Sequence, residues 1–148
     1  MAGSAAEARA EFVKVYRYTY AVFYGADHIN DGTALGYGPG NDREHATFWL
    51  ERDFGTDARF GAGVEWTRQG EGRIGDFWDP ADSQSQNAGA SLSGVVEKTV
   101  FPHARAELRW RDVLTLRARV GAALVDNPGH VPGEDTSLRG SVETRVQW

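Results

Sequence analysis

The feature that most constrains the fold is a strict alternation of apolar and polar residues over long stretches of the chain. Within residues 58–68 the even positions from Ala58 to Trp66 are apolar, whereas the odd positions carry Arg59, two glycines, Glu65 and Thr67. Residues 43–54 alternate in nearly the same way. Because successive side chains of a β-strand point to opposite faces, this period of two predicts strands with one apolar and one polar face.

Period-two segments recur along the chain and predict an all-β fold of about seven to eight strands. The clear segments are residues 43–54, 58–68, 104–111, 114–124 and 137–148, and the less regular ones are residues 12–24 and 88–100. Tight connections at 55–57, 101–103 and 111–113, with longer polar ones elsewhere, predict an antiparallel up-and-down β-barrel within residues 11–148. Two of these tight connections follow each other around residues 104–111, which breaks the alternation of short and long connections.

The N-terminal residues are expected to be separate from the barrel. Ser4 and Glu7 fit a capping box ahead of an alanine-rich segment, so residues 1–10 are predicted to form a tail or a short helix. The segment lacks the basic start and apolar stretch of a secretory signal. We therefore expect either a cytosolic protein or a chain that begins after a removed signal.

Charge and hydropathy exclude some classes of protein. The net charge of −5 disfavours nucleic-acid binding, which needs a basic face. The longest hydrophobic run is residues 20–24, whereas a membrane helix needs roughly 20 apolar residues. A membrane β-barrel remains compatible with this composition, because its signal is alternation rather than mean hydropathy.

Two classes of all-β protein fit the alternation, and they differ in which face lies inside. In a soluble, calycin-like barrel the apolar face lines a cavity for a small ligand, whereas in an outer-membrane barrel it contacts lipid and the charged face lines the lumen. We expect the membrane barrel, because opposed charges and small residues share the polar faces and aromatics fall near strand ends on the apolar faces. These aromatics are Phe54, Trp66, Trp110 and Trp148.

Residues 24–72 carry a family resemblance. Tyr24-Gly25 precedes the glycine-rich segment 32–42 (GTALGYGPGND), which is followed by a strand hairpin and by residues 65–72 (EWTRQGEG). This order resembles the C-terminal part of the Wzi-like capsule-assembly family, in which a Gly-x-x-Leu-Gly segment runs into a Gly-Pro-Asp-like turn; here Gly40 and Asn41 separate the proline from the aspartate. The resemblance implies an outer-membrane β-barrel of a Gram-negative cell that holds capsular polysaccharide. Family members are longer, so a second chain is an expected partner if this chain leaves the barrel incomplete.

The polar faces supply the candidate ligand-binding residues. The chain has fourteen arginines and only two lysines. A GC-rich genome would account for this bias, as would guanidiniums held in crowded, paired positions. The polar-face charges either neutralise one another or form a track for an anionic polysaccharide, because arginine pairs bidentately with carboxylate and phosphate. The candidates are Arg59, Glu65, Arg105, Arg109, Arg117, Arg119 and Arg139, with Tyr37 and Trp78 as aromatic faces in the loops.

No catalytic site, metal or cofactor is expected. The histidines are scattered without metal-ligand spacing, and the chain has no P-loop, Gly-x-Ser-x-Gly or cysteine nucleophile. The aspartates near residues 76–82 are interpreted as turn formers rather than calcium ligands. The remaining alternative, a small barrel enzyme, requires His28, His45 or His103 within hydrogen-bond reach of a serine or aspartate.

Overall fold

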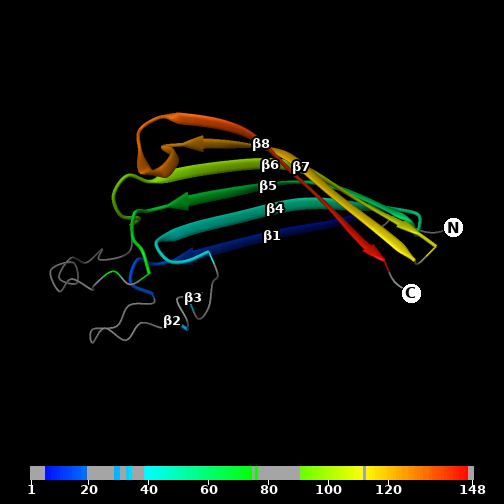
Figure 1. The fold of residues 1–148 in the computed structure, drawn as a ribbon, viewed down its shortest axis with the longest axis horizontal. Coiled ribbons are helices and arrows are strands. Elements are labelled where there is room, and N and C mark those ends of the chain that lie inside the picture. The colour runs from blue at the N-terminus through cyan, green and yellow to red at the C-terminus, as the bar shows by residue number, and fades with distance from the viewer. Residues whose placement is uncertain are drawn as a thin grey trace.

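One antiparallel sheet of six long strands dominates the structure, a computed structural model that describes residues 6–19, 29–30, 33–34, 39–74, 76, 91–111 and 113–146. The strand order follows the sequence, so the all-β, up-and-down expectation is confirmed (Figure 1). The strands are β1 (Ala6–Val15), β4 (Arg43–Phe54), β5 (Ala58–Gln69), β6 (Glu97–Trp110), β7 (Leu114–Asp126) and β8 (Glu134–Val146). A separate pair joins β2 (Ile29–Asn30) to β3 (Thr33–Ala34), and η1 (Pro128–His130) is a 3-10 turn.

The described sheet has six strands rather than seven or eight, because β6 runs unbroken through residues 101–103. Pro102 led to the expectation of a turn there, since proline has no backbone N–H to donate. The β5–β6 register runs through Phe101 and Pro102, whereas the β6–β7 register has no pair for them. The missing donor therefore interrupts pairing on one side only. With this turn removed, short and longer connections alternate regularly and the described strand number is even.

The two irregular strands expected from the sequence have different bounds in the structure. The first ends at Val15 instead of reaching residue 24, and residues 20–28 lie outside the described part of the chain. The second begins at Glu97 instead of residue 88. Glycine, serine and alanine dominate residues 88–94, and such a composition has little preference for a strand.

The helix expected within residues 1–10 is wrong for the described part of that segment, because residues 6–10 belong to β1. Ala6 to Val15 pair antiparallel with Arg52 to Arg43 of β4. The same residues carry a period of two, with alanines at even positions and Glu7, Arg9 and Glu11 at odd positions. Pairing along β4 outweighs the intrinsic helix propensity of alanine.

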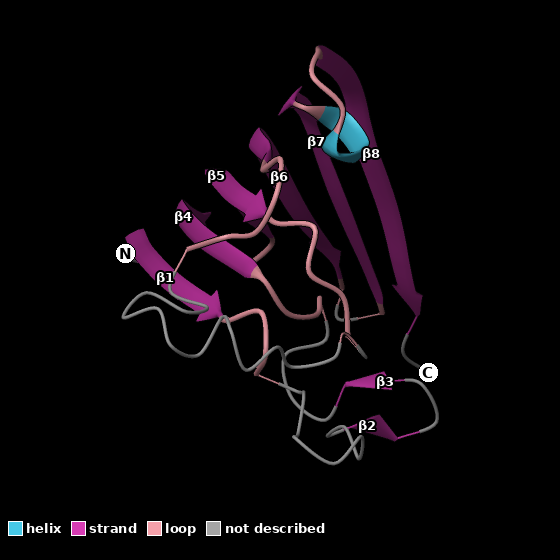
Figure 2. Cartoon of the chain, turned by 90° about the vertical axis from the view of Figure 1, so that its left-hand side faces the viewer, coloured by secondary structure: helices cyan, strands magenta, loops and turns pink. Residues whose placement is uncertain are grey.

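The sheet rolls into an open trough instead of a closed barrel. β1 and β8 lie at opposite ends of the arc and are not paired with each other in the described sheet (Figure 2). In every strand pair of the large sheet, odd residues pair with odd residues and even residues with even ones. All odd-numbered strand residues therefore lie on one face of the sheet and all even-numbered ones on the other. We call the odd-numbered face the inner face, because buried side chains such as Glu51 and His103 and two clefts lie on it, and the even-numbered face the outer face, where a further cleft of about 370 Å³ opens beside Trp66 and Leu124.

Glycines on the inner face make room for large side chains across the strands. A Cβ at Gly63 would lie 2.8 Å from the Trp49 Cβ, and one at Gly121 would lie 2.7 Å from the His103 Cβ. These contacts are shorter than carbon atoms tolerate. The bulky inner side chains and the glycines opposite them are therefore matched across neighbouring strands.

Replacing Gly121 by alanine should lower the free energy of unfolding by about 1–3 kcal/mol, because the added methyl group overpacks the contact with His103. Gly140→Ala is the matched control, because its Cβ would have the backbone oxygen of Arg119 at 3.4 Å, an ordinary contact distance. Urea unfolding followed by tryptophan fluorescence measures both. Equal effects of the two substitutions would contradict the proposed packing.

Candidate functional site

A row of alternating charges crosses five strands on the inner face. The residues, from β4 to β8, are Asp53, Arg59, Glu107, Arg117 and Glu143. Arg59 Nε donates to Asp53 Oδ1 at 2.6 Å, and Arg117 Nε donates to Glu107 Oε2 at 2.8 Å. Arg117 also lies 3.7 Å from Glu143. Opposite charges therefore face each other at each step, the arrangement that stabilises cross-strand pairs.

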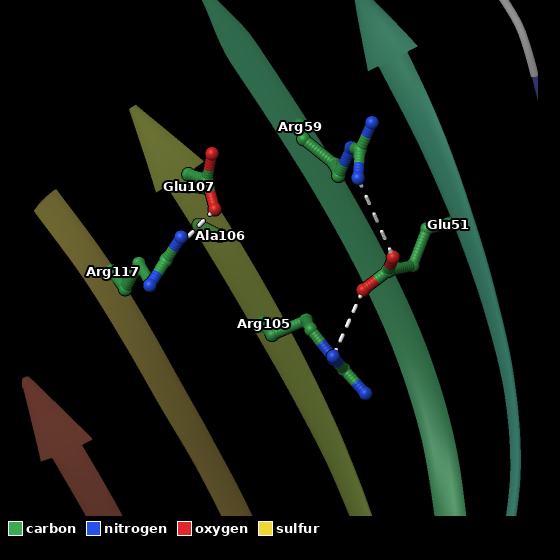
Figure 3. Close-up of a pocket in the computed structure, with 6 residues that line it drawn as sticks. All are labelled: Glu51, Arg59, Arg105, Ala106, Glu107 and Arg117. Carbon is green, nitrogen blue, oxygen red and sulfur yellow. Dashed lines mark hydrogen bonds and ion pairs between the residues drawn. The ribbon is translucent and has the colours of Figure 1, made fainter. Parts of the chain in front are cut away.

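Glu51 is the most buried carboxylate of the inner-face ion pairs, and it lies between two arginines from neighbouring strands (Figure 3). Arg105 Nη1 is 3.0 Å from Glu51 Oε1, and Arg59 Nη1 is 4.0 Å from Glu51 Oε2. The side chain of Glu51 is only 10% exposed. The Arg105 guanidinium also lies over the Trp49 ring, 5.0 Å from the ring centroid. A cleft of about 350 Å³ opens beside these residues.

A second group lies nearer the middle of β6 and β7. Arg119 donates to Glu65 and packs over the Phe101 ring at 4.8 Å. The Phe101 and His103 rings stack at 5.3 Å. The Nδ1 atom of His103 is 3.3 Å from both the Phe101 carbonyl oxygen and the Arg119 guanidinium. Among the described residues, His103 forms no hydrogen bond to the serine or aspartate that the enzyme alternative requires, and His28 lies outside those residues.

A cleft of about 300 Å³ opens beside this group, between β7 and β8. Its lining residues are Glu65, Phe101, Arg119, Arg139, Gly140 and Ser141. Arg139 forms no ion pair with any residue that the structure describes, whereas Arg119 is held by Glu65. The cleft thus combines one uncompensated guanidinium, one hydroxyl group and one aromatic ring.

The structure places all seven charged candidates from the sequence on the inner face, but they do not form one site. Five of the six candidate arginines are paired with carboxylates, whereas Arg139 is the candidate arginine without a carboxylate partner among the described residues. Arg109 pairs with Glu107 at 2.7 Å near the short turns. Tyr37 and Trp78 lie outside the described residues.

Asp42, which was not among the residues predicted from the sequence, joins two connections at the long-loop end of the sheet. Its side chain is buried, and its carboxylate accepts hydrogen bonds from the backbone N–H of Gly72 at 2.8 Å and of Ser93 at 3.2 Å. The Ser93 hydroxyl also donates to it. A Cβ at Gly70 would overlap this carboxylate. The signal available in the sequence was an aspartate directly before one strand and a Gly-Glu-Gly directly after the next.

A row of charged residues also crosses all six strands on the outer face, close to the same end. The members, paired in order from β1 to β8, are Lys14, Glu44, Arg68, Lys98, Asp126 and Glu134. Glu44 binds Lys14 at 2.9 Å and Arg68 at 3.1 Å, and Lys98 binds Asp126 at 3.1 Å. This outer charged row bounds the apolar face on the side of the long loops. The alternation within a single strand does not predict this row, because each strand contributes only one of its members.

No group of three or more histidine, aspartate or glutamate side chains within the described ranges is arranged to hold a metal ion. No helix among those residues has the length and hydropathy to cross a membrane. No protein-family model, curated protein or solved structure matches the chain.

Replacing Glu51 by glutamine should lower the free energy of unfolding by about 2–3 kcal/mol, because a buried carboxylate that forms ion pairs with Arg59 and Arg105 is lost. Glu143→Gln is the control, since its side chain is 62% exposed and water replaces the lost contact. Urea unfolding of both variants gives the comparison. If Glu143→Gln lowers the free energy of unfolding as much as Glu51→Gln does, burial of the carboxylate does not determine the cost of removing its charge.

Proposed function

We propose that this chain forms the wall of an outer-membrane β-barrel, with its outer face against lipid and its charged inner face lining the lumen, and that it binds anionic surface polysaccharide. The observation that carries the proposal is the inverted distribution of polarity. Buried and half-buried charges occupy the inner face, whereas most of the exposed large apolar side chains of the sheet point outward.

Thirteen large apolar side chains of the outer face are exposed, on all six strands. The most exposed are Leu138 at 85%, Val142 at 72% and Trp110 at 67%. Soluble monomers rarely expose contiguous apolar patches beyond a few hundred Å², and larger ones mark contact with a partner or a membrane. Lipid tails are a partner that can cover an apolar surface spread over a whole sheet.

The dimensions of the apolar band fit a membrane. On β7 the outward positions are apolar from Leu114 to Leu124, which spans about 33 Å along an extended strand. The strand tilt of about 40° found in barrels reduces this height to about 25 Å, the height of the apolar band in outer-membrane barrels. The outer charged row bounds the band at the long-loop end. The Phe54 and Phe60 rings, which meet edge to face with centroids 5.6 Å apart, lie near the opposite end.

The two ends of the sheet differ as the two sides of such a barrel do. The short turns at residues 55–57 and 111–113 lie at one end, and the longer connections lie at the other (Figure 1). Outer-membrane barrels have short periplasmic turns and longer extracellular loops. The soluble, calycin-like alternative receives no support from this arrangement, because it requires the apolar face to line the cavity.

Replacing Val120 by lysine tests the lipid contact, because Val120 lies at the middle of β7 and is 61% exposed. Folding into phospholipid vesicles should become about 2–4 kcal/mol less favourable, the cost of a lysine near the bilayer midplane. Val146→Lys is the depth control at the end of β8, where a cost of about 0–1 kcal/mol is expected. Folding is read from the mobility shift between boiled and unboiled samples.

Two outcomes would contradict the lipid contact. One is equal folding of the Val120→Lys variant and the unmodified chain in vesicles. The other is a folded, soluble monomer of the unmodified chain in buffer without lipid or detergent.

The polysaccharide part of the proposal rests on the cleft between β7 and β8. The guanidinium of Arg139 can donate to a uronate carboxylate without breaking an ion pair to a described residue, and Ser141 and the Phe101 ring can contact the sugar. The paired arginines serve a different purpose, since their charges are already neutralised by Glu51, Glu65 and other carboxylates. The residues that bind the glycan are therefore expected to be few and close to β8.

Arg139→Gln should weaken binding of a soluble polyuronate by about tenfold, the effect of losing one charge-assisted hydrogen-bonded pair. Arg111→Gln is the control, with the same change of charge at an exposed position beyond the end of β6. Calorimetric titration of the detergent-folded protein measures both. Unchanged affinity of the Arg139 variant would refute this cleft as the glycan site while leaving the membrane proposal intact.

A further inference from the structure

The two edges of the described sheet carry unpaired backbone groups. β1 and β8 each bond to one neighbour only, and both faces of β8 are exposed almost throughout. In a bilayer no water is present to bond these N–H and C=O groups, so only closed sheets span the hydrocarbon region. The inference that follows rests on the proposed membrane location, because the same edges in water carry a smaller cost.

Six strands are too few to close a barrel around this inner face. Eight strands already give an interior just wide enough for side chains, and bacterial outer-membrane barrels begin at eight. The inner face holds Trp49, Phe101, His103 and a full set of arginine–carboxylate pairs. A ring made by pairing β1 with β8 of the same chain would have no room for them.

The two edges complement each other. With six strands in up-and-down order β1 and β8 run in opposite directions, so they can pair antiparallel in the manner of the rest of the sheet. Apart from Lys14 and Glu134 of the outer charged row, their outward residues are small or uncharged, such as Ala8 and Val142, which continues the outer face across a seam. On the inner face Glu11 of β1 and Arg145 of β8 have opposite charges, and neither forms an ion pair with the described residues.

We propose that a second copy of this chain closes the barrel. β8 of each copy pairs antiparallel with β1 of the other, which gives two identical seams and a ring of twelve strands. A two-fold axis along the barrel relates the copies, so their short turns lie on the same side of the membrane and no edge remains open. Glu11 of one copy and Arg145 of the other lie on the same inner surface near each seam.

Engineered cysteines test the seams directly, because the chain has no cysteine of its own. One cysteine replaces an outward residue of β1 and a second replaces an outward residue of β8, in the full chain folded into vesicles. The nine double variants combine Ala6→Cys, Ala8→Cys or Ala10→Cys with Val142→Cys, Thr144→Cys or Val146→Cys, and so scan the register of the seam. A bifunctional thiol reagent is then added, and products are separated by gel electrophoresis after denaturation.

The expected result is a covalent dimer in the variants whose register matches, and no crosslinked dimer from the corresponding single-cysteine variants. A crosslink within one chain would show a six-stranded ring and overturn the proposal. Dimers from single-cysteine variants would show β1–β1 or β8–β8 contact and would also overturn it. Vesicle-folded protein that forms no crosslink in any variant would refute the second copy but not the membrane location, which has its own test in the Val120→Lys comparison.

A charge exchange provides a second, independent readout. Arg145→Glu places like charges near each seam and should reduce the yield of crosslinked dimer about fivefold. Adding Glu11→Arg in the same chain exchanges the two charges at both seams and should restore the yield. Arg111→Glu is the control for the change in net charge. If Arg145→Glu lowers the yield of crosslinked dimer and the added Glu11→Arg does not restore it, the pairing of these edges is contradicted.

Discussion

The structure depends on one geometric constraint: in every strand pair the register joins odd residues with odd residues and even residues with even ones. A shift by one residue in any pair would turn all side chains of the next strand to the opposite face. Because the registers keep their parity, the alternation present in each strand becomes two continuous surfaces. One is apolar across six strands, and the other carries charges that only neighbouring strands can neutralise.

The inner charges explain why the register is so well defined. Glu51 reaches Arg59 and Arg105 on the next two strands, and Arg117 reaches carboxylates on both of its neighbours. A slipped register would leave several of these groups shielded from water and unpaired, which costs far more than an exposed pair contributes. The glycines at positions 63 and 121 add a steric requirement, because they must lie opposite Trp49 and His103.

Much of the fold could be predicted from the sequence, because strand period is a local property. Residues 43–54 and 58–69 alternate clearly and lie where the alternation placed them, and the all-β class follows from such segments. Two local signals misled the prediction. The alanine-rich start of β1 has high helix propensity, and Pro102 suggested a turn, yet pairing with a neighbouring strand determined the structure in both places. The candidate site was only partly predictable. The inner position of Arg139 follows from alternation, but its lack of an ion pair depends on which carboxylates the neighbouring strands present.

The central claim is that the even-numbered face meets lipid and the odd-numbered face does not. Trp110 and Trp49 test it within one protein, because Trp110 lies on the outer face and Trp49 on the inner face beside Arg105. The measurement is quenching of tryptophan fluorescence by brominated phospholipids, in vesicle-folded variants that retain only one of these two tryptophans and carry phenylalanine at the other tryptophan positions. Strong quenching of Trp110 with little quenching of Trp49 is the predicted result. Equal quenching of both, or stronger quenching of Trp49, would contradict the assignment of the two faces.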